Sequence, residues 1–389
     1  MYKQRSLFRH IEPYLHSPEA IIITGMRRTG KTTLLNHIYG SIESKNKIFL
    51  DLENPVNRKY FEEENYERIK KAFEFMGIDF NARPYIFLDE IQLVKNLSSI
   101  AKYLIDHYRV KFFLTGSASF YMKNLFTESL AGRKYIFELF PLTFKEFLGF
   151  KEIRFKIPAD RPDISKTMHD NLDMFYDEFM RFGGFPGVVL KSSVEEKKKA
   201  LEEIFNSFYQ LEILQLGDFR KNEKIRDLIL LLAERVGTKI DIQKLSRDLG
   251  ISRPTIYEYL AFLESTFFLH MLRPYSKGKS TEIRKMPKLY LCDSGLAYHL
   301  GMKDLGRLFE NSVFQDLKRK GSIHYFQKKS GAEIDFILAK RYAYEVKLTP
   351  QATDVKKLKK VALELKLKGA KIVAKKFNDL DDIIYGFML

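Results

Sequence analysis

The residues best suited to chemistry in the first part of the chain form a phosphate-binding loop. Gly25 to Thr32 reads GMRRTGKT and fills every required position of a P-loop. The two glycines let the loop wrap so that several backbone N–H groups point at one anion. Lys31 is expected to reach the β- and γ-phosphates of a nucleotide, and the Thr32 hydroxyl to ligate Mg²⁺. The expected nucleotide-binding residues are Gly25, Arg27, Arg28, Thr29, Gly30, Lys31, Thr32 and Thr33.

A pair of acids downstream indicates that the nucleotide is hydrolysed. The apolar run 85–88 (YIFL) ends in Asp89 and Glu90, which places a carboxylate at the end of a predicted buried strand. We expect Asp89 to hold Mg²⁺, mostly through water, and Glu90 to orient or deprotonate the attacking water. An ordinary acidic pair on the surface is the alternative, which the P-loop upstream disfavours.

Three further residues are candidate sensors of the nucleotide. Thr115 and Ser117 follow the predicted strand 111–114, where a polar side chain could contact the γ-phosphate, although a plain strand cap stays open. Arg133 lies in the segment LAGRKYIFELFPLTFKEF, where an arginine could stabilise the charge that grows on the transferred phosphoryl group. An ordinary surface position is the alternative for Arg133.

Apolar runs predict the elements that position these residues. The run 20–24 (AIIIT) predicts a buried strand directly before the P-loop, and residues 33–39 predict the helix that follows it. The runs 47–52, 85–88 and 111–114 predict further strands of a parallel sheet. Residues 1–150 are therefore predicted to be an α/β P-loop domain.

Residues 237–292 have the element order of a winged helix-turn-helix. Asp241 is predicted to cap a helix that ends at Gly250, and Ser252 to cap the next helix after a short turn. Two predicted strands then flank a basic wing, which suits contacts to phosphates, although winged helices also serve as packing modules. The expected DNA-binding residues are Arg253, Lys277, Lys279, Arg284 and Lys285.

A second set of candidate catalytic residues lies in residues 300–389. The expected order is helix, three strands, helix and strand, with Glu310 on the first helix. A tight turn near residues 339–341 would pair the strands EIDFIL and YEVKL, which brings Asp335 and Glu345 within reach of one divalent ion. That metal would polarise a phosphodiester, with Lys347 positioning the nucleophile and Glu310 completing the shell. The alternative is a nuclease fold that does not cleave.

The expected catalytic residues come from both candidate sites, and so do the expected metal ligands. The expected catalytic residues are Glu90, Glu310, Asp335, Glu345 and Lys347. The expected metal ligands are Thr32, Asp89, Asp335 and Glu345.

The distribution of charge favours a polyanion as a partner. The chain of 389 residues has a formal net charge of +16. Residues 301–389 carry 19 basic and 11 acidic side chains, so half of the excess lies in less than a quarter of the chain. A basic excess in one module is typical of nucleic-acid binding, although a solvated lysine surface stays open.

Length and cysteine content indicate a cytoplasmic protein with several domains. A chain of 389 residues is too long for one core, so two to four domains are expected. The single Cys292 excludes a disulfide framework and fits a reducing compartment. No stretch approaches 18 uncharged apolar residues, so we expect no membrane span and no membrane partner.

Several motifs together resemble one prokaryotic family. They are GMRRTGKT, YIFLDE, FLTGS, LAGRKYIFELFPLTFKEF, GGFP, LYLCDSGL and ENSVF…EIDFIL…YEVKL. The chain resembles archaeal and bacterial proteins that join an AAA+-like P-loop ATPase to a winged helix and a restriction-endonuclease-like, PD-(D/E)xK domain of unknown function. The resemblance implies ATP and Mg²⁺ as cofactors and an α/β fold in four parts. These are an ATPase domain (1–150), a helical lid (151–236), a winged helix-turn-helix (237–292) and a nuclease-like domain (300–389).

Two functions from different classes remain open. The first is an ATP-dependent DNA-processing enzyme in which the nucleotide state gates binding or cleavage by the C-terminal half. The second is a signalling or regulatory ATPase switch whose C-terminal modules only bind DNA or protein. The intact Glu310, Asp335, Glu345 and Lys347 set favours the first, and the unclear sensor arginine favours the second. Homo-oligomerisation stays open in both.

Overall fold

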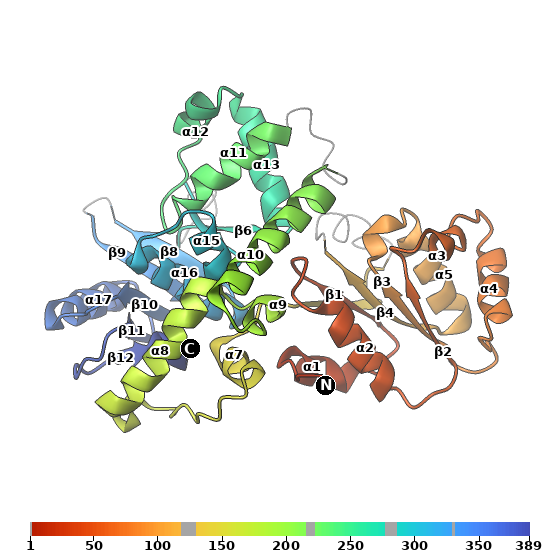
Figure 1. The fold of residues 1–389 in the computed structure, drawn as a ribbon, viewed down its shortest axis with the longest axis horizontal. Helices are drawn as coiled ribbons and strands as arrows, with labels where there is room; N and C mark the ends of the chain where they lie inside the picture. Colours follow the sequence, from red (N-terminus) through yellow and green to blue (C-terminus); the bar gives the residue numbers. More distant parts are fainter. Residues whose placement is uncertain (1, 118–129, 215–221, 277–285, 329–330) are drawn as a thin grey trace. The chain divides into compact units, whose positions relative to one another are not determined.

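The chain folds into two compact units, each built around its own five-stranded sheet. The structure, a computed structural model, describes residues 2–117, 130–214, 222–276, 286–328 and 331–389 (Figure 1). The first unit comprises Met1–Phe140 with Ser265–Phe267, and the second comprises Pro141–Glu264 with Phe268–Leu389. The second unit therefore contains the three segments predicted to follow the ATPase domain, except Ser265–Phe267, together with residues 141–150 of the predicted ATPase domain.

The first unit is a parallel α/β sheet with strand order β2-β3-β4-β1-β5. The four predicted strands are present, and β5 is an addition that the sequence analysis did not predict. The elements are α1 (Leu7–Ile11), β1 (Ala20–Thr24), α2 (Lys31–Ser41), β2 (Lys47–Asp51), α3 (Pro55–Lys59), α4 (Tyr66–Phe75), β3 (Tyr85–Asp89), α5 (Leu97–Tyr108), β4 (Lys111–Gly116) and β5 (Lys134–Glu138).

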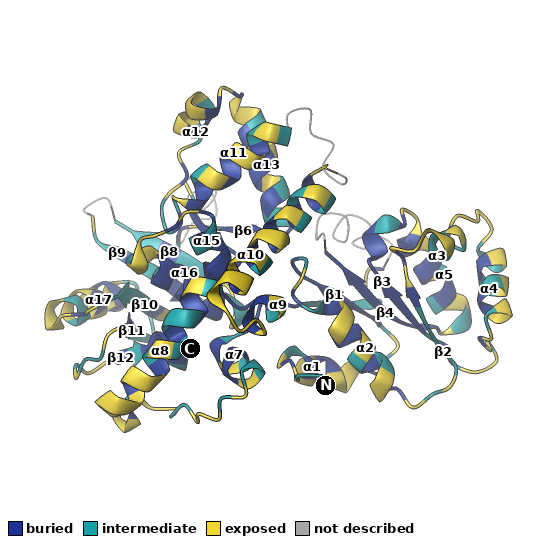
Figure 2. Ribbon diagram, viewed as in Figure 1, coloured by how far each residue is buried: buried dark blue, intermediate teal, exposed yellow. Residues whose placement is uncertain are grey.

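Alternation along the strands gives this sheet a separate core on each face. Alternate side chains of each strand point to opposite faces of the sheet. Those on one face pack with α1 and α2, and those on the other face pack with α4 and α5. The central strands β1, β3 and β4 are almost fully buried, whereas β2 and β5 at the edges are only partly buried (Figure 2). Phe87 and Phe113 stack on neighbouring strands with their ring centroids 4.4 Å apart. Sheets covered on both faces are held rigidly, so the carboxyl edge of this sheet is a firm base for a site.

The second unit combines helices with a mixed sheet of order β12-β11-β10-β9-β8 and a two-stranded sheet of β6 and β7. The expected order of helix, three strands, helix and strand occurs from α16 to β11, and β12 is an addition. The elements are α7 (Phe144–Phe150), α8 (Lys166–Phe182), α9 (Pro186–Val189), α10 (Val194–Phe208), α11 (Asn222–Ala233), α12 (Ile242–Leu249), α13 (Arg253–Ser265), β6 (Leu269–Leu272), β7 (Lys288–Leu291), α15 (Ser294–His299), α16 (Leu305–Arg319), β8 (Ile323–Gln327), β9 (Glu333–Leu338), β10 (Tyr342–Lys347), α17 (Ala352–Glu364), β11 (Gly369–Ala374) and β12 (Ile383–Tyr385).

The first long helix of the predicted lid is tied to the C-terminal sheet. Lys375, directly after β11, is buried, and its Nζ contacts Asp173 and lies 2.8 Å from Asp177 Oδ1, both on α8. His169 Nε2 of the same helix lies 3.1 Å from the Lys375 carbonyl oxygen. A buried ammonium with two carboxylates is costly to separate, so α8 is anchored within the second unit. The expectation that this segment acts as a lid over nucleotide gains no support from these contacts.

Two motifs that lie far apart in the sequence meet in the second unit. Asp293 accepts hydrogen bonds from Leu296 N at 2.9 Å, as the N-cap of α15, and from Gly184 N at 2.7 Å. Gly183 has a φ of +76°, and a Cβ there would lie 1.9 Å from the Asp293 carboxylate. The Gly184 carbonyl in turn accepts from Leu142 N at 2.6 Å. The GGFP turn is therefore a closely packed structural turn.

In the part of the chain that the structure describes, no helix is both long enough and apolar enough to cross a bilayer.

Candidate functional site

The P-loop connects β1 to α2 in a backbone conformation that requires glycine at two points. Gly25 has a φ of +143°, and a Cβ there would lie 2.3 Å from the Leu139 carbonyl oxygen. Gly30 has a φ of +95° and is the N-cap of α2. Both values lie where a side chain is strained, so glycine is the residue that lets the loop close on itself. The loop thus opens onto the positive end of the α2 dipole.

Hydrogen bonds inside the loop and from the N-terminal segment fix its shape. Lys31 Nζ donates to the carbonyl oxygens of Gly25 (3.0 Å) and Met26 (3.1 Å), and the buried Thr29 hydroxyl donates to Met26 O at 2.9 Å. Arg5, also buried, donates to Thr29 O and to Phe140 O, each at 2.7 Å. Arg5 was not predicted from the sequence. It lies 20 residues before the motif, and no spacing rule connects an arginine at that distance with the loop.

The remaining P-loop side chains are less deeply buried. Arg27 lies 3.2 Å from Glu53 Oε1 in an ion pair, and Arg28 is exposed with a φ of +67°. Thr32 and Thr33 are exposed in the first turn of α2. All eight expected nucleotide-binding residues are thus in the loop or the first helical turn, as their sequence positions require.

Asp89 lies at the carboxyl end of β3 and is buried. β3 is separated from the P-loop strand β1 by β4, so it is not the direct neighbour of that strand. The Thr115 hydroxyl donates to Asp89 Oδ1, and the Thr32 hydroxyl is also bonded to the carboxylate. Burial raises the pKa of Asp89, while the hydrogen bonds from Thr115 and Thr32 oppose the shift. A buried carboxylate next to the Thr32 hydroxyl offers the oxygen ligands that Mg²⁺ prefers. These residues therefore fit a Mg²⁺ ion.

Glu90 is connected to Ser117 through a glutamine. Glu90 has a φ of +54°, and its Oε2 accepts a hydrogen bond of 2.6 Å from Gln92 Nε2. The same Nε2 lies 3.1 Å from Ser117 Oγ at the end of β4. A candidate base and a candidate sensor are therefore linked by one amide, which the sequence analysis did not identify.

Arg133 lies at the opposite end of the sheet from the P-loop. It immediately precedes β5, whose first residue pairs with Ala20 at the start of β1. Arg133 Nε lies 2.6 Å from Asp106 Oδ1. The P-loop follows the other end of β1, which is roughly 16 Å away along a five-residue strand. The expected contact between Arg133 and the nucleotide of the same chain is therefore not supported by this placement.

In the second unit, the expected catalytic residues of β9 and β10 lie together. The two strands pair through Phe336 and Tyr344, and the same register places Asp335 opposite Glu345 one step further. At that step Asp335 Oδ2 accepts a hydrogen bond of 2.9 Å from Val346 N. Lys347 Nζ lies 3.0 Å from Glu345 Oε1. The turn at Ala339 and Lys340, both with positive φ, joins the strands as predicted.

These residues line a cavity of about 720 Å³ between the two strands and α17. The charged side chains of its lining are the acids Glu333, Asp335, Glu345, Asp354 and Glu364 and the lysines Lys328, Lys347, Lys357 and Lys360. Burial, followed by repulsion from Asp335, raises the pKa of Glu345 to about 7. A cavity that combines carboxylates with lysines suits a phosphodiester held by a metal ion.

The Glu310 carboxylate contacts two residues of β7, Tyr290 and Lys288. Tyr290 donates to Glu310 Oε1 at 2.5 Å, and burial followed by repulsion from Asp335 raises the pKa of Glu310 to about 7. Lys288 on β7 lies 3.7 Å from Glu310 Oε1, 3.6 Å from Asp335 Oδ1 and 2.5 Å from Glu333 Oε1. Burial alone would lower the pKa of Lys288, but these carboxylates outweigh it and raise that pKa. Lys288 was not predicted as a site residue from the sequence.

The acidic residues of this cavity fit a metal as a pair and not as a triad. Among the described residues, no group of three or more His, Cys, Asp or Glu side chains is arranged to hold a metal ion. Glu310 is therefore not placed as a third ligand, because its carboxylate is engaged by Tyr290 and Lys288. Glu345 Oε2 is buried and has no hydrogen-bond partner among the described residues, so it is an acceptor that a cation would satisfy.

The predicted DNA-binding residues are placed only in part. Arg253 is exposed in the first turn of α13, after Ser252, whose hydroxyl accepts from Thr255 N at 3.3 Å. Lys277, Lys279, Arg284 and Lys285 lie outside the described residues. The helix-turn-helix elements α12 and α13 and the strands β6 and β7 occur in the expected order. The winged helix stays a prediction.

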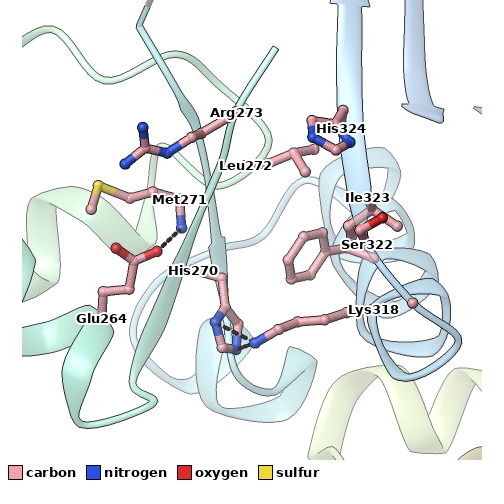
Figure 3. Close-up of a pocket in the computed structure, with 11 residues that line it drawn as sticks. Glu264, His270, Met271, Leu272, Arg273, Lys318, Ser322, Ile323 and His324 are labelled. Carbon is pink, nitrogen blue, oxygen red and sulfur yellow. Dashed lines mark hydrogen bonds between the residues drawn. The ribbon is translucent and has the colours of Figure 1, made fainter. Parts of the chain in front are cut away.

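A second cavity, of about 340 Å³, lies between β6, β8 and the end of α16 (Figure 3). Lys318 Nζ lies 2.7 Å from His270 Nδ1, and burial followed by the Lys318 charge lowers the pKa of His270 well below its usual value. The ring is therefore neutral and accepts the hydrogen bond. Glu264 accepts from Met271 N at 3.0 Å across the same cavity. None of the described site residues predicted from the sequence lines it.

Comparison with known families divides the chain into three matched segments. Residues 17–148 match the family described as "AAA domain". Residues 175–306 and 305–384 match two families, DUF8612 and DUF4143, which are described only as domains of unknown function. The first unit therefore contains an AAA-type ATPase domain, and the matched families assign no activity to the second.

The chain is also similar to proteins from archaea and bacteria. It is 28% identical to an uncharacterized protein of Methanocaldococcus jannaschii over 393 residues, which covers 97% of this chain and 86% of the relative. An uncharacterized protein of Haemophilus influenzae is 28% identical over 359 residues, which covers 86% and 84%.

Solved structures give weaker likenesses. The Walker-type ATPase PABY2304 of Pyrococcus abyssi covers 77% of this chain and 96% of its own, with 16% identity and a TM-score of 0.45. The ORC2 protein of Aeropyrum pernix in its ADP form covers 75% and 90%, with 15% identity and a TM-score of 0.37. With TM-scores below 0.5, these two likenesses assign no function to the chain.

Proposed function

We propose that the AAA-type ATPase domain of this chain binds and hydrolyses ATP in the presence of Mg²⁺. The observation that carries the proposal is the placement of Asp89 beside the Thr32 hydroxyl, at the carboxyl edge of a parallel sheet that also presents the P-loop. In open α/β sheets, ligands bind at this edge. A phosphate at the start of α2 would meet the loop N–H groups, the helix dipole and Lys31 together.

Each residue then has a distinct role toward ATP. Lys31 exchanges its two loop carbonyls for the β- and γ-phosphate oxygens, which are stronger acceptors because they are charged. Thr32 and Asp89 hold Mg²⁺, which when bound neutralises charge on the phosphates. Glu90 accepts a proton from the attacking water or orients it, and Gln92 fixes the direction of its carboxylate.

Two substitutions test this assignment by separating binding from hydrolysis. Lys31→Ala should abolish detectable ATP binding in calorimetry, because the tetra-anionic ligand loses its main cation. Glu90→Gln should bind ATP like the wild type but hydrolyse it at least about 100-fold more slowly. Lys71→Ala, an exposed lysine of α4, is the matched control and should change neither quantity. Wild-type binding by the Lys31 variant, or wild-type turnover by the Glu90 variant, would refute the respective role.

We propose further that the second unit processes DNA, with cleavage at the β9–β10 cavity as the candidate reaction. The supporting observation is the cavity of about 720 Å³ that Asp335, Glu345 and Lys347 line together. Its other charged lining residues are Lys328, Lys357, Lys360, Glu333, Asp354 and Glu364. Asp335 and Glu345 would hold a divalent ion that polarises the scissile phosphate. Lys347 would position the nucleophile or stabilise the developing negative charge.

A plasmid-nicking assay with Mg²⁺ or Mn²⁺, with and without ATP, tests the cleavage proposal. Nicking should require both the metal and Asp335, so Asp335→Asn should abolish it. Lys371→Ala is a control, because Lys371 is an exposed lysine of β11 that does not line the cavity. Wild-type nicking by the Asp335 variant would identify a contaminant. An inactive wild type that still binds DNA or a protein would favour the second candidate function, the regulatory ATPase switch. Within the described parts of the chain, no third acidic side chain is placed to hold the ion, and this keeps the candidate open.

DNA binding itself is tested through its salt dependence. Replacing Lys277, Lys279, Arg284 and Lys285 with Ala should weaken binding to all sequences alike, because phosphate contacts carry no sequence information. The slope of log K against log salt should become shallower by up to about 4 units. An unchanged slope would mean that these side chains do not contact the nucleic acid.

A further inference from the structure

Lys288 lies among the carboxylates of Glu310, Glu333 and Asp335, which are called the acidic cluster below. It begins β7, the strand that pairs with β6, and lies 22 residues before Glu310 in the sequence. Its side chain is 8% exposed, so the ammonium is almost fully removed from water. It contacts three carboxylates, those of Glu333 at 2.5 Å, Asp335 at 3.6 Å and Glu310 at 3.7 Å.

The position of this ammonium has a consequence for a metal ion. A divalent ion bound to Asp335 would sit about 2.0–2.6 Å from a carboxylate oxygen. The Lys288 ammonium, 3.6 Å from Asp335 Oδ1, would then be a like charge within a few ångströms of the ion in a poorly hydrated place. Such repulsion is strong because little water screens it. The ion and the Lys288 ammonium therefore compete for the Asp335 carboxylate.

The other contacts show why the cluster does not need a metal for its own stability. The Tyr290 hydroxyl donates to Glu310 Oε1 at 2.5 Å, and Val346 N donates to Asp335 Oδ2 at 2.9 Å. Lys347 lies 3.0 Å from Glu345 Oε1. Carboxylates that are buried this closely need cations or donors, and among the described residues the protein supplies them at every contact named here, while Glu345 Oε2 keeps no hydrogen-bond partner.

We propose that Lys288 is a built-in cation that competes with a divalent metal for the Asp335 carboxylate, so that metal binds tightly only when Lys288 moves away. The proposal rests on the candidate cleavage function and adds a form of regulation to it. Withdrawal of the Lys288 side chain from Asp335 would free that carboxylate for the ion.

Metal titration of the full chain tests the competition. Mn²⁺ binding, followed by electron paramagnetic resonance or calorimetry, should be weak in the wild type and at least about tenfold tighter in Lys288→Met, because the competing charge is gone. Lys288→Arg keeps the charge and should bind as weakly as the wild type. The double variant Lys288→Met with Asp335→Asn should lose the gain.

A matched control and a second measurement distinguish the loss of the competing charge from a folding defect. Lys239 is an exposed lysine that donates to Gln327, so Lys239→Met should leave Mn²⁺ affinity unchanged. Lys288→Gln is a milder neutral variant that should show the same gain as Lys288→Met. In thermal unfolding with a chelator, both neutral variants should melt below the wild type, and Mn²⁺ should restore them, since it replaces the missing positive charge.

Outcomes for this proposal and for cleavage are distinguishable. Equal Mn²⁺ affinity in the wild type and both neutral variants, weaker affinity in the variants, or no binding in any of them would overturn the competition. Tighter binding without nicking would support the competition and refute cleavage. Nicking that depends on Asp335, with no effect of Lys288 on Mn²⁺ affinity, would support cleavage and refute the competition.

Discussion

Glu90 illustrates at the level of a single residue what the sequence can and cannot define. Its type and its place after an apolar run predict a base at the end of a strand, and the structure places it there. Its left-handed backbone (φ +54°) and its hydrogen bond to Gln92 depend on how the chain turns after β3. A non-glycine residue in this conformation is strained by about 1 kcal/mol or more, and such strain is common at functional sites.

The link through Gln92 leads to a prediction about catalysis. Gln92→Leu removes the donor that orients the Glu90 carboxylate, so kcat for ATP should fall by about tenfold while ATP affinity stays within about twofold. Ser117→Ala removes only the far partner of the amide and should have a smaller effect on kcat. Steady-state kinetics with a separate binding measurement would decide. An unchanged kcat would mean that Glu90 is oriented by other contacts.

At the level of elements, the sequence predicted what depends on local pattern and missed what depends on distant partners. Runs such as AIIIT and YIFLD are apolar at every position, so β1 and β3 could be found. β5 was missed because KYIFE is only half-buried, and β12 because three residues give no pattern. The Asp335–Glu345 pair was predictable because a short turn joins its strands. Contacts of Arg5, Gln92 and Lys288 were not, since they depend on tertiary packing.

The packing of α15 against the GGFP turn leads to a prediction about stability. A Cβ on Gly295 would lie 2.1 Å from the backbone carbon of Phe182, so Gly295→Ala forces two backbones apart. We expect a loss of at least about 3 kcal/mol in the free energy of unfolding of the second unit. Gly149→Ala is the matched control, because nothing lies within 4 Å of a Cβ on that helical glycine. It should be neutral or stabilise by up to about 1 kcal/mol. Chemical denaturation of both variants measures the difference.

Asp293 leads to a prediction about pH. Burial raises its pKa from 3.8 to about 6, although the N–H groups of Gly184 and Leu296 oppose the shift. Because the folded state binds the proton more tightly, its contribution to stability is complete below pH 3.8 and is lost as the pH rises to about 6. The loss amounts to about 3 kcal/mol. Asp293→Asn should be less stable at every pH but lack this decline. Urea unfolding between about pH 4 and pH 7 would show it, and parallel curves for variant and wild type would contradict it.

At the level of the whole molecule, the chain consists of two bodies with separate cores and separate candidate sites. The P-loop and Asp89 belong to the first body, and Asp335, Glu345 and Lys288 belong to the second. Ligands that bind one folded body stabilise that body by mass action. The two candidate sites can therefore be examined independently in the same protein.

This separation predicts how ATP changes the unfolding curve. Calorimetry should show two transitions, and Mg²⁺ with a slowly hydrolysed ATP analogue should raise only the one that belongs to the first unit. At about a hundredfold excess over Kd, the gain should be about 2.7 kcal/mol. Lys31→Ala should abolish the gain and leave both transitions present. A single transition that shifts as a whole would mean that the two units unfold as one.

The hydrogen bonds of Arg5 bear on where the ATPase module can be cut. The matched AAA segment starts at residue 17, yet Arg5 holds the carbonyl oxygens of Thr29 in the P-loop and Phe140 after β5. An excised fragment that begins at residue 17 would expose these two acceptors and release the loop from the end of the sheet. Its nucleotide affinity would then understate that of the intact chain. The module that binds nucleotide therefore has to include Arg5, which lies before the segment matched by sequence similarity.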